Sequence, residues 1–392
     1  MLKSVRIKNY RSIRDEVFID FSATKYSMLR NENLYNNIVK GALFVGGNAT
    51  GKTNFIFSIS VLLDLLFANI QIDTPQFCLF SDDNEMLLEY CFVFDKDEII
   101  YSLTFDRSGS VVLERLFLNN DNLLDRIKLN ATTKLTEAGR YDSNTIDDKT
   151  LFLKNIYFNT KFTGFPELQK WFDYMSNSIY FNAERKQGFF QPSNVVSFNK
   201  NIKVGIRNYL ESNGVEEINK FFLEYGFNQQ IDYASEKQVG KRLTIRTSEK
   251  EIFLKRKEID ISLPIGYESL GNKTLLDMLP GLLHVVNNGG MFIVDEFSSA
   301  FHNELEELIV KYFMKNSQAA QMFFVSHSTN LLKNTLLRPD QIYAVELKDN
   351  RGSKVRRFSS EGPRESQNLE KMYLSGVFGG LPHFNLESED ET

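Results

Sequence analysis

The residues with the clearest chemical meaning form a glycine-rich segment that ends in a lysine and a threonine. It reads Gly46-Gly47-Asn48-Ala49-Thr50-Gly51-Lys52-Thr53 and is followed by Asn54. Glycines let such a loop fold tightly, so that backbone N–H groups and the positive end of the following helix point at phosphates. In the pattern Gly-x4-Gly-Lys-Thr, the lysine reaches the β- and γ-phosphates and the threonine hydroxyl ligates Mg²⁺. We therefore predict that residues 46–54 bind ATP, with Lys52 in a catalytic role and Thr53 as a Mg²⁺ ligand.

Two adjacent carboxylates follow a short apolar run later in the chain. The run Met291-Phe292-Ile293-Val294 leads directly into Asp295 and Glu296. At the end of a buried parallel strand, Asp295 would face the Mg²⁺ bound by Thr53, and Glu296 would orient or deprotonate the attacking water. Taken alone, an apolar run ending in Asp-Glu is common, and a helix cap is the alternative. Together with the phosphate loop, the pattern predicts Asp295 as a metal ligand and Glu296 as a catalytic residue.

A histidine occupies the corresponding place after another apolar run. His327 lies within Ser326-His327-Ser328, just past the apolar run Met322–Val325. If the two strands are neighbours, its imidazole would lie near the γ-phosphate and could donate a hydrogen bond to it. We predict a catalytic or sensing role for His327. His284 and His383 carry weaker signals, and His302 is equally compatible with a helix start and with a contact across a subunit interface.

A fourth motif precedes the Asp-Glu run. The chain reads Glu268-Ser269-Leu270-Gly271-Asn272-Lys273-Thr274 where a helix is expected to begin. Ser269 and Gly271 at a helix N-terminus would form an anion-binding nest. Ser-Gly turns start many helices, so the motif gains weight only from its order relative to the others. We predict that Ser269 and Gly271 contact nucleotide bound to a second subunit, because they cannot reach the phosphate loop of their own chain.

These residues require buried strands that end at one edge of a sheet. The continuous apolar run Gly41–Val45 is typical of a strand buried on both faces, and an apolar helix from Asn54 to about Ala68 follows the loop. The last third of the chain alternates helix and strand patterns in the same way. We expect strands at Met291–Val294, Met322–Val325, Ile342–Leu347 and Lys354–Phe358, and helices at Thr274–Val286, from Asn303 and around Thr329–Asn334.

The first hundred residues show the period-two alternation of strands. Three runs, Met86–Phe94, Ile99–Asp106 and Val111–Leu118, are separated by the turn sequences Asp95-Lys96-Asp97 and Arg107-Ser108-Gly109-Ser110. They predict an antiparallel meander beside the phosphate-loop strand. From the turn cluster Asn119–Asn122 onward the pattern becomes more polar, with helical stretches at Glu167–Met175 and Ile202–Tyr225.

Composition and charge exclude several classes of protein. The 392 residues carry 46 Lys and Arg against 51 Asp and Glu, a net charge of −5, which excludes a uniformly basic nucleic-acid coat. Two cysteines are too few for a disulfide framework or a four-cysteine zinc site, and no apolar stretch is long enough to cross a membrane. We expect a cytoplasmic protein. Eight basic residues between Lys237 and Lys257 favour a hydrated charged hairpin, with a nucleic-acid contact as the alternative.

The order of these motifs resembles the head domain of ATP-binding-cassette ATPases, and within that class the SMC-like and OLD-like ATPases. The opening Val5-Arg6-Ile7-Lys8-Asn9-Tyr10-Arg11-Ser12 resembles the start of that group. The block Gly271–Leu276 is similar to the signature of the abortive-infection ATPases called RloA or AbiLi, with Asn272 where that family usually has threonine. The segment Tyr373–Pro382 resembles their ending. Residues 120–265 show no such likeness, and Gln187 and Gln191 are the candidates for a glutamine loop.

The resemblance implies an α/β fold: a mixed-sheet ATPase head with an antiparallel meander and a largely helical insertion. We expect an N-terminal ATPase lobe (1–118), an insertion (119–265), a C-terminal ATPase lobe (266–386) and an acidic tail (387–392). The family resemblance also implies a homodimer or higher oligomer, in which ATP lies between the phosphate loop of one subunit and the signature of the other. The chain after His327 is shorter than the nuclease domain of OLD proteins, so an effector nuclease or toxin would be a separate polypeptide.

Three functions fit these features. The first is an Mg²⁺-dependent ATPase of an antiphage, abortive-infection type of defence system that gates or scaffolds a separately encoded effector. The second is a DNA repair or recombination ATPase that binds DNA directly through Lys3, Arg6, Lys8 or the basic segment. The absence of sustained heptads and the negative net charge favour the first. The third is a scaffold that binds nucleotide without turnover.

Overall fold

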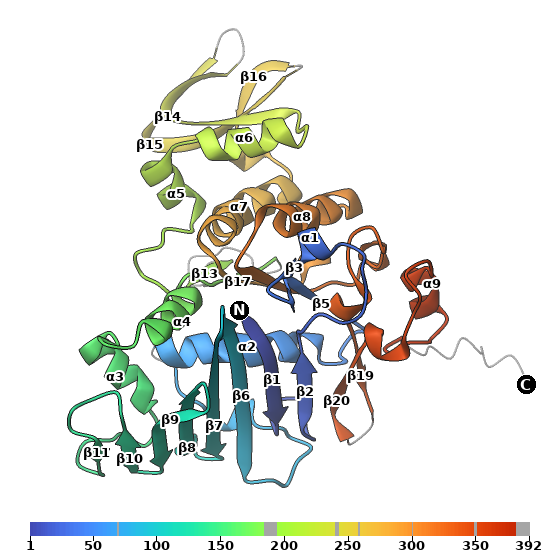
Figure 1. Cartoon of the computed structure of the whole chain (residues 1–392). Coiled ribbons are helices and arrows are strands. Elements are labelled where there is room, and N and C mark those ends of the chain that lie inside the picture. Colours follow the sequence, from blue (N-terminus) through green and yellow to red (C-terminus); the bar gives the residue numbers. More distant parts are fainter. Residues whose placement is uncertain are drawn as a thin grey trace, which may run out of the picture.

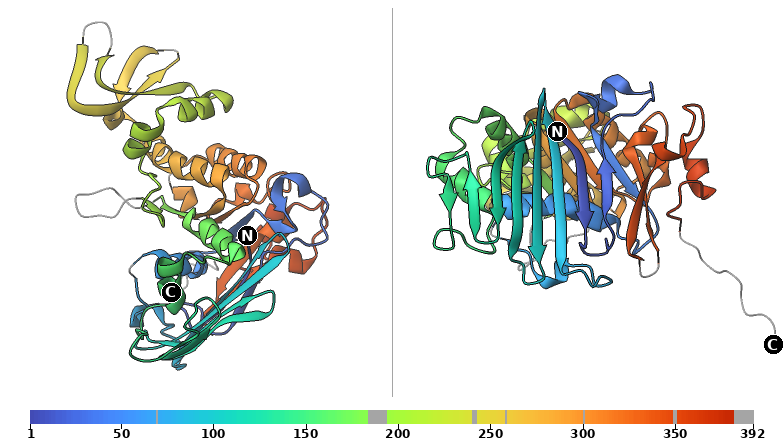
Figure 2. Two further views of the ribbon diagram at one scale, coloured as in Figure 1. Left: turned by 60° about the vertical axis from the view of Figure 1, so that its left-hand side comes forward. Right: turned by 60° about the horizontal axis from the view of Figure 1, so that its bottom comes forward.

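The computed structural model describes residues 1–68, 70–183, 194–239, 243–257, 259–299, 301–348 and 351–381. Within these residues the chain is layered (Figure 1). An antiparallel sheet is followed by helix α2 (Lys52–Phe67), a mixed sheet, and helices α7 (Leu270–Asn288) and α8 (Asn303–Asn316). A small lobe built around a long hairpin lies beyond α7, and Figure 2 shows the same layers from two other sides. The expected α/β fold with a mixed sheet and an antiparallel meander is confirmed.

The antiparallel sheet contains the predicted meander. Its order is β11-β10-β9-β8-β7-β6-β1-β2. The strands are β1 (Leu2–Lys8), β2 (Val17–Asp20), β6 (Glu85–Phe94), β7 (Asp97–Asp106), β8 (Val111–Leu118), β9 (Asp121–Ile127), β10 (Asn130–Thr133) and β11 (Arg140–Tyr141). The sequence predicted this meander beside the phosphate-loop strand. In the structure the meander and that strand lie in different sheets, and α2 lies between the two sheets.

The turn cluster after β8 is tighter than its sequence suggests. Asn119 and Asn120 adopt positive φ angles of 50° and 68° and reverse the chain directly into β9. Asparagine tolerates this left-handed conformation, which matches the twist of a hairpin. The antiparallel sheet therefore continues through β9, β10 and β11 beyond residue 118, where the sequence indicated only loops and helices.

The mixed sheet positions the predicted site. Its order is β13-β12-β17-β18-β5-β19-β20, in which β12, β17, β18, β5 and β19 run parallel and β13 and β20 are antiparallel to their neighbours. The strands are β5 (Gly41–Val45), β12 (Ile179–Asn182), β13 (Val195–Ser197), β17 (Gly290–Asp295), β18 (Ala320–Val325), β19 (Ile342–Leu347) and β20 (Ser353–Arg357). The four strands predicted for the last third of the chain are thus present.

Both faces of this sheet are buried, which explains its continuous apolar runs. Ala42 and Phe44 of β5 pack with α2 and the antiparallel sheet. Leu43 and Val45 pack on the other face, with side chains of α7 and α8. Alternate residues of one strand therefore contribute to two separate hydrophobic cores, so both faces favour apolar residues.

One predicted helix in this part of the chain is wrong. Around Thr329–Asn334 only a 3-10 turn, η4 (Thr329–Leu331), is present. The Asn330 side chain donates to the Asn303 carbonyl, and the Asn334 side chain donates to the Glu365 and Gln367 carbonyls. These bonds to distant backbone hold the segment in an irregular path that competes with a helix.

The lobe consists of the hairpin sheet and two short helices. Strands β14 (Gln229–Val239), β15 (Leu243–Arg256) and β16 (Ile259–Pro264) pair in order, beside α5 (Ile206–Asn213) and α6 (Glu216–Glu224). The segment from Lys237 to Lys257 forms most of this hairpin, as favoured from the sequence. Lys237 pairs with Asp232 at 2.5 Å and Arg246 with Glu236 at 3.0 Å. Lys241 and Arg242 lie outside the described residues, and the nucleic-acid alternative stays a prediction.

The remaining described elements are short, and they connect the layers. They are α1 (Arg30–Asn33), β3 (Leu34–Tyr35), β4 (Ile38–Val39), α3 (Phe152–Thr160), α4 (Pro166–Ser176) and α9 (Leu369–Leu374). The predicted segment 119–265 thus contains α3 to α6 together with strands of three sheets, and the division of the chain into domains stays a prediction. The acidic tail lies outside the described residues. No helix in the described part is long and apolar enough to cross a membrane.

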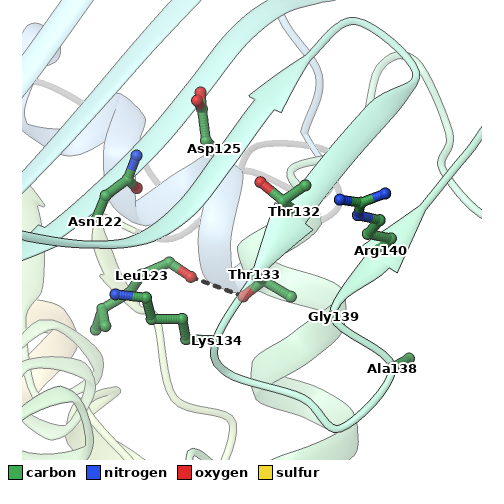
Figure 3. A pocket seen from close by; sticks show the side chains of 9 residues that line it. All are labelled: Asn122, Leu123, Asp125, Thr132, Thr133, Lys134, Ala138, Gly139 and Arg140. Atoms are coloured by element: carbon green, nitrogen blue, oxygen red, sulfur yellow. Dashed lines mark hydrogen bonds between the residues drawn. The ribbon is translucent and has the colours of Figure 1, made fainter.

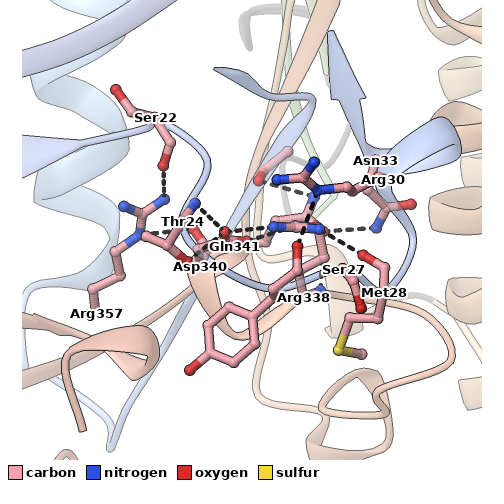
Figure 4. Close-up of polar contacts among 12 residues, drawn as sticks. Ser22, Thr24, Ser27, Met28, Arg30, Asn33, Arg338, Asp340, Gln341 and Arg357 are labelled. Carbon is pink, nitrogen blue, oxygen red and sulfur yellow. Dashed lines mark hydrogen bonds and ion pairs between the residues drawn. The ribbon is translucent and has the colours of Figure 1, made fainter. Parts of the chain in front are cut away.

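A buried ion pair fixes the start of β19, the strand beside the phosphate-loop strand (Figure 4). The Arg338 guanidinium donates two hydrogen bonds of 2.8 Å to the Asp340 carboxylate, and both side chains are fully buried. Thr24 donates its backbone N–H and its hydroxyl to the same carboxylate. Although burial works to raise it, the pKa of Asp340 is lowered by the Arg338 and Thr24 bonds. The Gln341 amide then donates to the Gly41 carbonyl at 3.3 Å, which links this cluster to the first residue of β5.

Candidate nucleotide site

The predicted motifs meet at one edge of the mixed sheet. The phosphate loop follows β5, Asp295 ends β17, and the His327 turn follows β18. These strands are parallel neighbours, so their carboxyl ends lie together, where open α/β sheets bind ligands. A cavity of about 370 Å³ opens there. Its lining residues are Ser12, Asn48, Ala49, Gly51, Lys52, Thr53, Asn54, Glu296 and His327.

The phosphate loop is held in a strained, tightly gripped conformation. Ala49 and Gly51 have positive φ angles of 59° and 95°. A Cβ atom on Gly51 would lie 2.2 Å from the Ser353 hydroxyl oxygen and 2.4 Å from that of Ser12. Gly51 is therefore required by both conformation and space. Because the first N–H groups of a helix have no partner within it, those of Lys52 and Thr53 at the start of α2 suit an anion in this cavity.

Lys52 lies folded into the loop that precedes it. Its ammonium donates to the carbonyls of Gly46 at 3.1 Å and Gly47 at 2.7 Å, and its side chain is buried. Burial lowers the pKa of Lys52, while the nearby carboxylates Glu296 and Asp295 act to raise it. An ammonium has three donors, so one remains for a ligand oxygen beyond the two bonds seen among the described residues. A desolvated cation in a loop of N–H groups suits a triphosphate.

Thr53 and Asp295 form the pair expected for a metal. The Thr53 hydroxyl donates to one Asp295 carboxylate oxygen at 3.1 Å, and the Asn182 amide donates to the other at 3.2 Å. Asp295 is buried. Hydroxyl and carboxylate oxygens are the hard donors that Mg²⁺ takes, usually with phosphate oxygens and water. The donor set fits Mg²⁺ bound with a nucleotide rather than a site made by protein alone. Within the described residues, no group of three or more His, Cys, Asp or Glu side chains is placed so that it could hold a metal ion.

Glu296 and His327 both line the cavity and lie close to each other. The Glu296 carboxylate oxygen and the His327 Nε2 atom lie 3.7 Å apart, and both side chains are partly exposed. The backbone N–H of His327 donates to the Ser298 hydroxyl at 3.0 Å. Glu296 has a φ of 54°, a left-handed conformation that its side chain disfavours. The Ser299 N–H and hydroxyl both donate to the Glu296 carbonyl and hold it there. Strain of this kind gathers at functional sites.

Ser269 and Gly271 lie away from this cavity, on a surface of their own. Ser269 caps α7, and its hydroxyl accepts the Asn272 N–H at 3.3 Å, so the predicted helix start is confirmed. Neither residue lines the cavity of the same chain. Tyr267 and Leu270, which flank Ser269, are 80% and 69% exposed. The predicted contact with a second subunit stays a prediction.

Of the three other histidines, the structure describes His302 and His284. His302 caps α8, and its Nδ1 atom accepts the Glu304 N–H at 3.5 Å, so the helix-start alternative is what the structure shows. His284 lies within α7, where burial lowers its pKa. His383, Gln187 and Gln191 lie outside the described residues.

The structure adds three residues that sequence reasoning missed. Asn182 ends β12 and bonds Asp295, while Ser12 and Ser353 grip Gly51. The Ser353 hydroxyl donates to Ser12 at 2.7 Å and lies 2.7 Å from the Thr50 carbonyl. Asn182 had a readable signal, because the run Ile179–Phe181 ends in a polar residue just as Met291–Val294 does. Ser353 had none, since its place depends on a long-range contact.

A second hollow lies at the far end of the antiparallel sheet (Figure 3). It measures about 650 Å³ and is lined by residues of β9, β10 and β11 and the turn between the last two. Within it the Thr133 hydroxyl donates to the Leu123 carbonyl at 2.9 Å. None of the motif residues lines this hollow, so it is separate from the nucleotide site.

Fold and site together define a P-loop ATPase of the AAA class. The chain belongs to the family described as "AAA domain, putative AbiEii toxin, Type IV TA system", whose model matches residues 42–333. A search of the curated proteins found no match.

A solved structure of an SMC head has the same fold. This structure, an SMC head bound to the C-winged helix domain of ScpA, is 13% identical with a TM-score of 0.53, over 90% of this chain and 96% of that one. Another, the SMC head domain from Thermotoga maritima, is 14% identical with a TM-score of 0.48, over 90% and 97%. At this identity the first structure shows the shared fold alone.

Proposed function

We propose that this chain binds Mg²⁺-ATP between two copies of itself and hydrolyses it to gate a separately encoded effector in an antiphage defence system. The observation that carries the ATPase part is the convergence of Lys52, the Thr53–Asp295 pair and the Glu296–His327 pair on one cavity. Each pair comes from segments more than two hundred residues apart or from neighbouring strand ends, so a chance assembly of this chemistry is improbable.

The residues divide the work of phosphoryl transfer to water. The N–H groups at the start of α2 and the Lys52 ammonium hold the phosphates and stabilise the charge that develops on them. Thr53 and Asp295 would hold Mg²⁺, which neutralises phosphate charge. The Glu296 carboxylate accepts a proton from the attacking water, and His327 Nε2, 3.7 Å from that carboxylate, donates to the γ-phosphate.

The second half of the site is proposed to come from another copy. Ser269 and Gly271 start a 19-residue helix whose positive end is directed out of the chain rather than into its own cavity. Seating this N-terminus on the γ-phosphate of a second copy would bury the exposed Tyr267 and Leu270 side chains. ATP then acts as the joint of a homodimer, and hydrolysis opens it.

The defence role is supported by the family description and by the signature motif. The description of the family names a toxin of toxin–antitoxin systems, and one SMC head with the same fold is described as bound to a partner protein, ScpA. The signature Gly271–Leu276 resembles that of abortive-infection ATPases. Together these favour an ATPase that controls an effector nuclease or toxin over one that acts alone.

The test is the variant Glu296→Gln, which removes the base and keeps the shape. We expect ATP turnover to fall at least about 100-fold while nucleotide stays bound and the dimer accumulates, measured by phosphate release and by size-exclusion chromatography with ATP. Glu304→Gln, at an exposed position in the first turn of α8, is the matched control and should behave as wild type. Turnover by Glu296→Gln at the wild-type rate would show that Glu296 is not the base.

A further inference from the structure

One segment near the end of the described chain bonds both the phosphate loop and the turn that carries His327. Residues 369–380, which we call the C-terminal strap, comprise helix α9 and the glycine turn that follows it. The strap lies outside the range matched by the family model, residues 42–333. It packs on β19 and on the 3-10 turn η7 (Phe358–Glu361) through buried side chains, with Phe378 stacked on Phe358 at a ring distance of 3.7 Å.

The first end of the strap bonds the turn that carries His327. Glu370 accepts a hydrogen bond of 2.7 Å from the Thr329 hydroxyl, two residues after His327. Asn368 caps α9 by accepting the Lys371 N–H at 2.8 Å, and Leu369 beside it is fully buried. The Glu370 carboxylate is therefore held in place by an anchored helix start rather than by a free loop.

The other end of the strap bonds the phosphate loop. The Gly380 carbonyl accepts the Gly47 N–H at 2.9 Å. Gly380 has a φ of 77°, and a Cβ atom there would lie 3.1 Å from the Val345 carbonyl oxygen. A side chain at this position would strain the backbone and press on β19, so glycine is what allows the close approach.

The two ends are joined by a hydrogen bond to a single atom. The Tyr373 hydroxyl donates to the Gly380 carbonyl at 3.3 Å, so the oxygen that receives the Gly47 N–H also receives a bond from α9. Burial raises the pKa of Tyr373 to about 12, which keeps its hydroxyl a donor at neutral pH. A continuous path thus runs from Thr329 through Glu370, α9, Tyr373 and Gly380 to Gly47.

We infer that the C-terminal strap couples the phosphate loop to the His327 turn, with Glu370 and Gly380 as positioning residues. The inference rests on the proposed ATPase function. Gly380 fixes the loop that holds the phosphates, and Glu370 fixes the turn that presents His327 to the same nucleotide. A loop shifted by bound ATP moves the turn with it, because the strap is packed as one body.

The Gly380 end is tested by Gly380→Ala. We expect the KM for ATP to rise about fivefold, since a hydrogen bond of this kind contributes a factor of that order, and hydrogen exchange of the Gly47 amide to accelerate. Gly362→Ala is the matched control, because Gly362 also has a left-handed φ, 61°, with nothing within 4 Å of an added Cβ. Equal effects of the two variants on KM and on Gly47 exchange would overturn the role of Gly380.

The Glu370 end is tested by Thr329→Val and Glu370→Ala, each of which removes the same hydrogen bond from one side. We expect kcat to fall about threefold in both, with the KM for ATP unchanged. Glu370→Gln keeps an oxygen acceptor and should restore kcat, which a purely electrostatic role of Glu370 would not allow. A Glu370→Ala variant with wild-type kcat would overturn this assignment.

The coupling itself is measured by combining Gly380→Ala with Thr329→Val. If the strap links the two ends, the double variant loses less in kcat/KM than the product of the single losses, because the path is already broken. If the loss in kcat/KM of the double variant equals the product of the single losses, the proposed coupling is overturned, while the proposed ATPase function is not affected. A wild-type chain that neither binds nor hydrolyses ATP would instead overturn the proposed function, so the two failures are distinguishable.

Discussion

The phosphate loop is gripped by three distant segments of its own chain, whereas the start of α7 is gripped by none of them and faces outward. Ser12, Ser353 and Gly380 each contact residues 46–51, and Lys52 is folded into the same loop. At the other motif, the Ser269 hydroxyl caps its own helix by accepting the Asn272 N–H, and the side chains of Tyr267 and Leu270 nearby are exposed. The phosphate-loop half of the proposed site is thus held in place within one chain, whereas the half at the start of α7 is exposed and needs a second chain to cover it.

This difference indicates that nucleotide affinity and turnover depend on different parts of the chain. A preorganised loop loses little entropy when it takes up phosphate, so nucleotide affinity resides in a single copy. An outward helix start adds charge stabilisation only once a second copy arrives, so turnover depends on assembly. Nucleotide binding and hydrolysis should therefore be separable by mutation.

The strongest predicted losses of turnover come from mutating the phosphate loop and the start of α7 separately. Lys52→Ala should abolish nucleotide binding and reduce turnover at least about 100-fold. Ser269→Arg should reduce turnover as severely while leaving nucleotide affinity near wild type, because Ser269 does not line its own chain's cavity. Phosphate release and a fluorescent ATP analogue measure the two quantities.

Mixing the two variants tests whether the loop of one chain and the signature of another form one active site. In equal amounts they should regain about a quarter of wild-type turnover, because about half of the dimers are mixed and one site in each has an intact loop and an intact signature. No recovery on mixing, with both variants folded, would mean that loop and signature do not meet between chains.

A smaller loss of nucleotide affinity is expected from Gly51→Ala, which tests whether the contacts around the phosphate loop matter for binding. The added Cβ collides with the hydroxyls of Ser12 and Ser353, so we expect a loss of nucleotide affinity of about tenfold or more. Gly164→Ala is a matched control: its φ of 94° equals that of Gly51 within a degree, and a Cβ there meets nothing within 4 Å. Calorimetric titration with ATP compares the two, and equal affinities would show that the grip does not matter.

A last prediction concerns the stability of helix α7 rather than binding or turnover. Burial raises the pKa of Asp277, on α7, from 3.8 to about 6, so the folded chain carries an unfavourable charge above that pH. The penalty is absent below pH 3.8, grows as pH rises to 6 and is complete above it. We expect Asp277→Asn to stabilise the chain by up to about 3 kcal/mol at pH 7.5 and hardly at pH 4. Thermal melts at both pH values, with the exposed Asp82→Asn as control, measure this; equal gains at both would contradict it.

Local patterns were enough to predict the elements that carry the site. The strands ending in the phosphate loop, in Asp295 and before His327 are continuous apolar runs, and burial on both faces leaves that mark in any sequence. Hairpin turns and the cap at Ser269 are equally local. The placement of Thr53 beside Asp295 followed from the rule that parallel strands end at the same edge.

Features set by long-range contacts could not be predicted in this way. Period-two runs show that strands exist, but they do not reveal that α2 divides them into two sheets. The segment after His327 has a helical pattern, yet Asn334 bonds the backbone near residue 365 and prevents the helix. Ser353 is an ordinary serine until the fold places it on Gly51.

The left-handed backbone at Glu296 has an evolutionary consequence. Glycine or asparagine at that position would relieve the torsional cost and give a more robust chain. A library screened only for heat resistance should therefore enrich glycine or asparagine at residue 296, and either replacement would remove the carboxylate that lies beside His327. Retention of glutamate there is what selection for activity, opposed by selection for stability, would leave behind.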